Sequence, residues 1–189
     1  MGPRNKLLMR DSFGRTMIGR VIETVLASQA NEVIVVTGHQ AEDVTLAARL
    51  ASSGNTRLRI IHAPNFANGL SASLKTGIKA LSHASAALVC LGDMPLVSSA
   101  ILDALIAAYH PVEGKTIIVP TYRGKRGNPV LWDRSFFSAM TSLAGDQGAR
   151  VLIGLHPANV AELECHDEAV LRDFDTPDTL GEGWGDPSA

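Results

Sequence analysis

Hydrophobic and polar residues follow two different periods along this chain. In some stretches apolar residues recur every three or four positions, which is typical of helices with one buried face. These stretches lie at residues 15–28, 41–52, 71–83 and 98–110. Between them are short runs of mostly apolar, often β-branched residues, which predict buried strands. These runs lie at residues 31–39, 56–63, 86–93 and 116–122.

The pattern is weaker in the last third of the chain. Its expected elements are a short strand at 128–132, short helices at 135–143 and 148–156, strands at 160–165 and 169–175, and a helical turn at 176–180. The polar, glycine-containing end over residues 181–189 is expected to be frayed.

Alternation of apolar strands with helices predicts an α/β fold, in which a mainly parallel sheet lies between helices on both faces. The 189 residues fit one domain, and no repeat or linker divides them. We therefore expect a domain over residues 1–180 and a flexible tail over 181–189. In such a sheet, ligands bind beyond the carboxyl ends of the strands.

Composition narrows the function classes. The net charge is −2 and no basic block occurs, so binding of nucleic acid through a phosphate-neutralising face is not expected. No apolar run approaches the roughly 18 residues that a membrane span needs, and the first residues do not resemble a signal peptide. Cys90 and Cys165 are far apart and form no CxxC pair. We expect a reduced, cytoplasmic protein.

Four segments follow directly after predicted strands, at residues 37–39, 64–69, 92–95 and 122–128. If the strands are parallel, these segments lie on one rim of the sheet. Together they hold small residues, one carboxylate and a basic loop. This mixture favours a phosphorylated ligand that binds with a divalent cation.

Asp93 is the carboxylate on this rim, held between Gly92 and Met94-Pro95 after a buried strand. A rigid single carboxylate suits Mg²⁺, which takes one or two carboxylates together with phosphate oxygens and water. The alternative is that Asp93 caps the next helix, although Ser98 and Ser99 already offer that cap.

A second acidic candidate lies in the sequence DFD. On a strand, Asp173 and Asp175 would point to one face, and either could be a metal ligand. The alternative is that Asp175 caps the turn that begins at Thr176-Pro177.

Two further segments have both a binding and a structural interpretation. Ser71 and Ser73 begin a helix whose amides would attract an anion or the edge of a base, or Ser71 is only an N-cap. In GDQGAR, Asp146 is a predicted N-cap, and Arg150 would contact a substrate phosphate or lie on a solvated helix face. No Ser-His-Asp, Cys-His or zinc pattern is visible. Metal-assisted transfer needs no protein nucleophile.

An ordered set of motifs carries a family resemblance from Met1 to about Leu180. The motifs are NKLL, VIVVTGH, NGLSASLKTGIKAL, LGDMPLV, RGNPVLW, GDQGAR and DFDTPDTL. LGDMP alone is moderately specific, whereas the ordered set is strong. The chain resembles the nucleotidyltransferases of molybdenum cofactor maturation, and within them the cytidylyltransferase branch.

The resemblance implies a three-layer α/β/α nucleotidyltransferase fold of Rossmann-like type. It also implies attack by a terminal phosphate of molybdopterin on the α-phosphate of CTP, with Mg²⁺ as cofactor and pyrophosphate as product. Partners would be CTP, the molybdopterin cofactor and molybdoenzymes of the xanthine dehydrogenase type.

Site roles are carried over by motif. Lys6 would neutralise triphosphate charge and Asp93 would hold Mg²⁺, with Asp173 or Asp175 completing the metal environment. The implied nucleotide contacts are Gly2, Lys6, Gly38, Asn68, Gly69 and Ser73. The implied acceptor contacts are Gly127, Asn128 and Arg150.

The first residues depart from the family pattern. Members begin with a strand and a glycine-rich loop, approximately LAAGxSxRMGxxK, of which only Met1-Gly2 before Lys6 is present. We therefore expect that this chain lacks the first, central strand, either because it starts at an internal Met of a longer protein or because it has lost catalysis. Two unpaired sheet edges would result, which predicts a homo-oligomer or low stability.

Two classes of function remain open. The first is a Mg²⁺-dependent cytidylyltransferase, because RNKLL has no acid before the lysine and is closer to the cytidylyl than to the guanylyl branch. The second is a non-catalytic module that binds or delivers molybdopterin. A transferase that uses GTP, or a sugar or polyol phosphate acceptor, is a further alternative, since the fold serves several chemistries.

Overall fold

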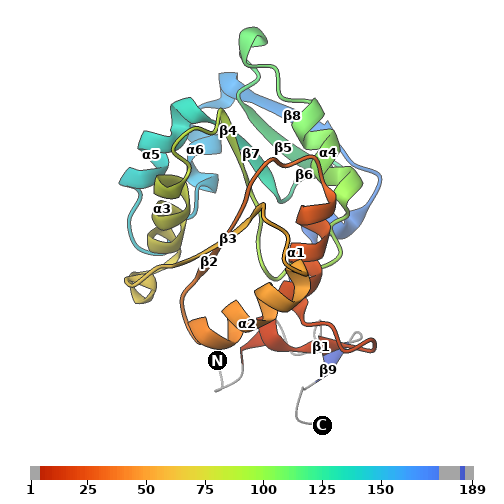
Figure 1. Ribbon diagram of the computed structural model, residues 1–189. Helices are drawn as coiled ribbons and strands as arrows, with labels where there is room; N and C mark the ends of the chain where they lie inside the picture. Colours follow the sequence, from red (N-terminus) through yellow and green to blue (C-terminus); the bar gives the residue numbers. More distant parts are fainter. Residues whose placement is uncertain (1–4, 175–183, 186–189) are drawn as a thin grey trace.

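Strands and helices alternate in the computed structural model, which describes residues 5–174 and 184–185 (Figure 1). The helices are α1 (Met17–Ala27), α2 (Ala41–Ser52), α3 (Leu70–Ala80), α4 (Ser99–Ala107), α5 (Phe137–Ser142) and α6 (Arg150–Leu155). The strands are β1 (Arg10–Asp11), β2 (Val33–Thr37), β3 (Leu58–His62), β4 (Ala86–Val89), β5 (Ile117–Tyr122), β6 (Lys125–Arg126), β7 (Val130–Asp133), β8 (Val160–Glu164) and β9 (Trp184–Gly185). Short 3₁₀ turns are η1 (Lys6–Leu8), η2 (Phe66–Asn68), η3 (Pro111–Glu113), η4 (Arg134–Phe136), η5 (Pro157–Asn159) and η6 (Glu168–Leu171). Among the described residues, no helix could cross a membrane.

Helix starts only partly follow the sequence signals. The Ser98 side chain caps α4 by accepting a hydrogen bond from the Ile101 N–H, so Asp93 is not the cap of that helix. The prediction that Asp146 is an N-cap is wrong, and so is the interpretation of Ser71 as only an N-cap. Gly69 is the N-cap position of α3 and Ala149 that of α6, and neither helix has a side-chain cap. The backbone of a neighbouring segment takes the place of a cap at α3, as described below.

Two sheets form the middle layer. Strands β2 and β3 pair in parallel, with Val33 opposite Leu58 and Thr37 opposite His62. The second sheet has the order β4-β7-β5, with β6 and β8 also paired to β5. The β5–β8 pair is parallel, as expected, whereas β7 runs antiparallel to both β4 and β5. After β5 the chain reverses through the short β6 hairpin, and β7 then runs back between β4 and β5.

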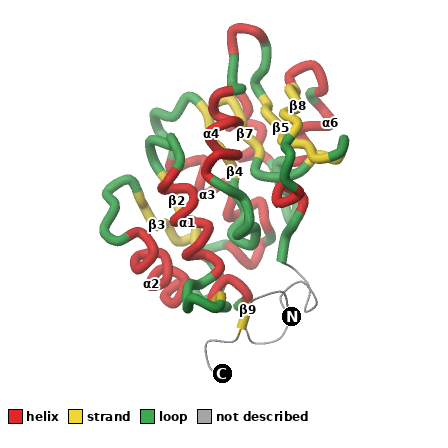
Figure 2. The backbone as a smooth tube through the Cα atoms, turned by 90° about the vertical axis from the view of Figure 1, so that its right-hand side faces the viewer, coloured by secondary structure: helices red, strands yellow, loops and turns green. Residues whose placement is uncertain are grey.

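Helices cover both faces of this layer, which confirms the three-layer α/β/α fold. Alternate residues of β4 face opposite sides, since Ala87 packs with α3 and α5 residues whereas Leu88 packs with α4 residues. On the second side, α1 and α4 lie next to each other (Figures 1 and 2).

Helices α1 and α3 connect the two sheets. Within the described residues, β2 pairs only with β3 and β4 only with β7. Val25 of α1 packs against the apolar clusters of both sheets. On the other face, Gly77 of α3 lies against Val36 of β2, and Ile78 packs in the cluster of the second sheet. The sheets therefore belong to one layer, although β2 and β4 are not hydrogen-bonded to each other.

The free edges differ in charge. The outer strands β3 and β8 carry Arg59, Glu162 and Glu164, and charged residues protect an edge from pairing with another chain. The facing strands β2 and β4, VIVVT and AALV, carry no charge.

We predict that the 20.0 kDa chain associates in solution or unfolds at low denaturant concentration, because the uncharged β2 and β4 edges are unpaired among the described residues. Sedimentation velocity over a rising concentration series should show species heavier than the monomer, or urea unfolding should show a low midpoint. A single monomeric species with a midpoint ordinary for a domain of this size would contradict the prediction.

Candidate functional site

The loops after β2 and β3 meet at the carboxyl ends of these strands. A Cβ atom at Gly38 would lie 2.7 Å from the Cβ of Phe66 in η2. The Phe66 ring is in turn 6.2 Å from the His62 ring at the end of β3. Glycine at position 38 therefore allows the close approach of Phe66, and the loop after β2 packs against η2 at this part of the rim.

The NGLSAS and GDQGAR motifs, 76 residues apart when Gly69 is compared with Gly145, lie against each other. Gly69 has a positive φ of 99°, and a Cβ there would lie 2.5 Å from both Gly145 and the Asp146 carboxylate. The Ser71 N–H donates to the Gly145 carbonyl at 3.1 Å. The Ser71 amide therefore already has an acceptor within the protein, whereas one of the two sequence interpretations had the amides at this helix start bind an anion or a base. Asn68 is exposed and Ser73 is half-buried on the first turn of α3.

Lys6 and Asp93 form an ion pair at the end of β4. The Lys6 Nζ lies 2.6 Å from the Asp93 Oδ2, and the two side chains are 22% and 19% exposed. The turn η1 that carries Lys6 is capped by Asn5, whose side chain accepts from the Leu7 N–H at 3.1 Å.

Gly92 explains how these two segments reach each other. A Cβ at Gly92 would lie 3.2 Å from Ile18 of α1 and 3.3 Å from Leu7 of η1. Both distances are tighter than ordinary van der Waals contact. The loop that carries Asp93 therefore packs directly on the turn that carries Lys6, and a side chain at position 92 would require Leu7 and Ile18 to shift.

The second carboxylate oxygen of Asp93 differs from the first. Its Oδ1 is buried, and no donor in the part of the chain that the structure describes bonds to it. An ionised oxygen in this state is costly unless a cation or donor satisfies it. An oxygen ligand of this kind suits Mg²⁺ or Mn²⁺. Within residues 5–174 and 184–185, no three His, Cys, Asp or Glu side chains are grouped to hold a metal.

The DFD segment also reaches Asp93. The Phe174 N–H donates to the Asp93 carbonyl at 3.1 Å, and Asp173 is exposed beside it. Asp175 and Gly2 lie outside the described residues. The prediction of a strand at 169–175 is wrong, because the chain forms the 3₁₀ turn η6 at Glu168–Leu171, with Asp167 as its cap.

The acceptor-side residues expected from the sequence come together around the β5–β7 connection. The Asn128 N–H donates to the Val170 carbonyl at 2.9 Å, and a Cβ at Gly127 would overlap that same carbonyl oxygen. The Arg150 Nη2 donates to the Arg126 carbonyl at 2.8 Å. Arg150 is thus exposed but bound to the hairpin, an arrangement that neither sequence interpretation included.

Residues 165–174 form a connection along the rim that sequence analysis did not predict. The Cys165 N–H donates to the Thr121 carbonyl at 2.7 Å at the end of β5. Further along, Val170 accepts from Asn128 and Phe174 donates to Asp93. One segment therefore fixes the acceptor-side loop and the Asp93 loop to each other.

Asp11 is a further residue that sequence analysis missed. Its carboxylate accepts from the Phe13 and Arg15 backbone N–H groups and from the Arg15 Nε, each at 2.9 Å. Burial raises the pKa of this carboxyl, but the hydrogen bonds from Arg15 and Phe13 outweigh it and hold the pKa below its usual value. The Met17 N–H donates to the Met9 carbonyl at 2.9 Å, which closes the loop between η1 and α1. The turn sequence DSFG was the available signal.

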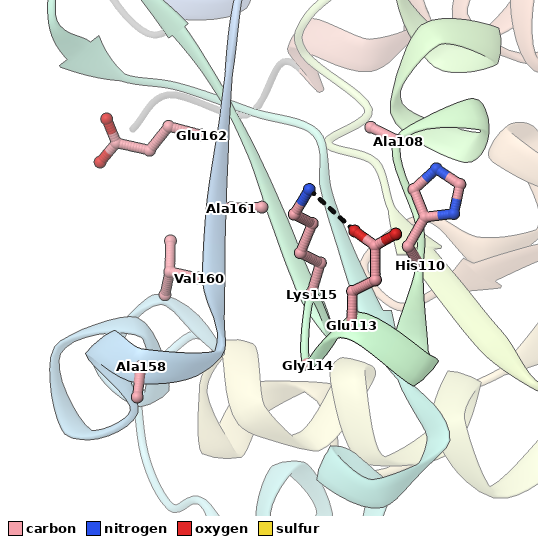
Figure 3. Close-up of a pocket in the computed structure, with 9 residues that line it drawn as sticks. All are labelled: Ala108, His110, Glu113, Gly114, Lys115, Ala158, Val160, Ala161 and Glu162. Carbon is pink, nitrogen blue, oxygen red and sulfur yellow. Dashed lines mark ion pairs between the residues drawn. The ribbon is translucent and has the colours of Figure 1, made fainter.

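A cavity of about 630 Å³ lies at the other end of the strands (Figure 3). It is formed around the start of β8 and the η3 loop, with Glu113 and Lys115 paired at 3.2 Å and His110 and Glu162 nearby. Because it lies at the amino ends of β5 and β8, it does not belong to the rim around Asp93.

The fold and the rim can be compared with known proteins. Residues 1–161 match the family model of the MobA-like NTP transferase domain. The chain belongs to this family.

Two curated relatives of this MobA-like domain cover most of it. Nicotine blue oxidoreductase of Paenarthrobacter nicotinovorans is 28% identical over 184 residues, which is 95% of this chain and 86% of the relative. Molybdenum cofactor cytidylyltransferase of Escherichia coli K12 is 26% identical over 165 residues, which is 85% of this chain and 79% of the relative.

Solved structures agree with the MobA-like fold. Rv0371c of Mycobacterium tuberculosis in complex with manganese has a TM-score of 0.76 at 24% identity, covering 95% of this chain and 91% of that one. CMP:2-keto-3-deoxy-manno-octonic acid synthetase complexed with CTP has a TM-score of 0.70 at 14% identity, covering 94% and 89%. At these identities the likeness establishes the fold alone, and the nucleotidyltransferase fold predicted from the sequence is confirmed.

We predict that Gly127→Ala destabilises the MobA-like domain by about 1–3 kcal/mol, because the added Cβ overlaps the Val170 backbone carbonyl and the rim must move apart. Gly154→Ala in α6 is the matched control, since nothing lies within 4 Å of its added Cβ and Ala favours helix. Urea unfolding of both variants measures the difference. Equal stability of the two variants would contradict the geometry.

Proposed function

We propose that this MobA-like domain transfers CMP from CTP to a terminal phosphate of the molybdopterin cofactor and releases pyrophosphate, with Mg²⁺ as cofactor. The observation that carries the proposal is the Asp93 carboxylate at the end of β4. One of its oxygens is bonded to Lys6 and the other is buried without a donor among the described residues. The relative named as a molybdenum cofactor cytidylyltransferase supports the choice of substrates.

Lys6 and Asp93 would bind the reacting end of the nucleotide. Asp93 would hold the metal ion through its Oδ1, and Lys6 would reach the triphosphate oxygens as a point charge. When bound, the metal ion neutralises the charge that develops on the leaving pyrophosphate. Asn68, Gly69 and Ser73 would lie on the nucleoside side, on the neighbouring part of the rim.

The basic hairpin would bind the acceptor. Arg123 and Lys125 are exposed there, and Arg150 holds the hairpin through the Arg126 carbonyl. A terminal phosphate oxygen of the acceptor attacks the α-phosphorus of CTP, and the bond from that phosphorus to the pyrophosphate oxygen breaks. No protein nucleophile takes part, because the substrates need alignment and charge stabilisation only.

A redox activity is the second candidate, because the relative named nicotine blue oxidoreductase aligns with 95% of this chain. Oxidation of NADH or NADPH in the presence of a quinonoid acceptor dye, with no pyrophosphate released from CTP, would favour it over the transferase.

We predict that Asp93→Asn lowers pyrophosphate release from CTP and molybdopterin by about 10²–10³-fold, because the charge that holds the metal ion is lost. The fold should remain intact, since Asn keeps the size of the side chain. Asp103→Asn is the matched control. Asp103 is also half-buried, and its Oδ1 accepts from the Gln29 N–H at 2.8 Å, which Asn can still do.

The rates come from a coupled pyrophosphate assay, and thermal unfolding checks each variant. Full activity of Asp93→Asn would remove Asp93 from the mechanism. An equal loss in Asp103→Asn would show that the assay reports on folding rather than on the site.

A further inference from the structure

The ammonium group of Lys6 binds the same carboxylate, that of Asp93, which a metal ion at this site would bind. Its Nζ is 2.6 Å from the Asp93 Oδ2, so it already neutralises this carboxylate. Lys6 reaches Asp93 across 87 positions of sequence.

The surroundings strengthen this ion pair. The Gly92 backbone, Leu7 and Ile18 pack beside it, and the buried Phe174 bonds to the Asp93 backbone. Apolar surroundings lower the local dielectric, so charges there act on each other more strongly than at an open surface. A divalent cation that approached Asp93 would meet the positive charge of Lys6 a few ångströms away, on the neighbouring oxygen of the same carboxylate.

We infer that Lys6 is the resident counter-cation of Asp93 and that a divalent metal ion binds tightly here only together with a nucleoside triphosphate. The triphosphate supplies anionic oxygens for the lysine, whose four-carbon stem lets the ammonium move, and it supplies further ligands for the metal. The pair thus keeps the metal site weak until the nucleotide arrives. Only the part of this inference that concerns the nucleoside triphosphate rests on the proposed function. The effect of Lys6 on metal affinity is expected without any nucleotide.

Metal binding can be measured directly with Mn²⁺, whose free form gives a paramagnetic resonance signal. We expect wild type to bind Mn²⁺ weakly without nucleotide and Lys6→Met to bind it at least about tenfold more tightly, because the competing positive charge is gone. Lys79→Met, on the exposed side of α3, is the control and should match wild type. Lys6→Gln is a second variant that keeps a polar end, and it should follow Lys6→Met.

Added CTP should raise the Mn²⁺ affinity of wild type and of Lys6→Met to different extents. Wild type should then gain Mn²⁺ affinity by a larger factor than Lys6→Met, which lacks the lysine that binds the triphosphate. Tight Mn²⁺ binding in the Lys6 variants should disappear when Asp93→Asn is added. Circular dichroism verifies that each variant is folded.

The outcomes are separable. Unchanged or weaker nucleotide-free Mn²⁺ binding in both folded Lys6 variants would overturn the inference. Tighter binding in these variants together with no effect of CTP on wild type would support the role of Lys6 in metal affinity and contradict the proposed use of CTP.

Discussion

Close packing at Gly92 is the constraint on which the candidate site depends. Because no side chain separates them, the loop after β4 contacts both η1 and the start of α1. This contact brings Lys6 to Asp93, although the two residues are 87 positions apart in the sequence. The Phe174 N–H then fixes the same loop from a segment near the other end of the domain. Three segments far apart in sequence thus converge on one carboxylate.

The rest of the rim is built by the same means. Gly38, Gly69 and Gly127 each lie where a Cβ would overlap a neighbouring segment, at Phe66, at Gly145-Asp146 and at Val170 respectively. These glycines allow loops from different strands to pack side by side at the carboxyl ends of the sheet. Gly69 also adopts a positive φ, which favours glycine, whereas at Gly38 and Gly127 the missing Cβ alone allows the close approach. The MobA-like family membership gives this rim its chemical interpretation.

Local sequence patterns predicted much of the fold but not its long-range pairing. The helices and strands from α1 to β5 follow their hydrophobic periods, and the expected α/β layers are present, whereas η1 and β1 were not predicted. The reversed direction of β7 was not predicted, because an apolar strand reads the same in either direction. The η6 turn was mistaken for a strand, since Ala169 and Val170 are buried by the rim rather than by a sheet.

The candidate site was predictable to a similar degree. Asp93 stood out by its place after a buried strand. The family resemblance placed Lys6 at the triphosphate and Asp93 at the metal ion, but the ion pair between the two side chains was not predicted. Neither interpretation of Ser71 anticipated that its N–H donates to the Gly145 carbonyl, 74 residues away, because this contact is not local in sequence. Asp11 was missed although its partners are local, because the DSFG turn signal was not used; its carboxylate accepts from Phe13 and Arg15 within four residues.

The proposed function requires the rim around Asp93 and Lys6 to bind a metal-complexed nucleoside triphosphate. Calorimetric titration of the chain with Mg·CTP measures this binding, with Mg·GTP and metal-free CTP as controls. We expect one-site binding of Mg·CTP that is stronger than that of Mg·GTP and that weakens without the metal. Absence of binding by either nucleotide, or binding that does not depend on the metal, would contradict it.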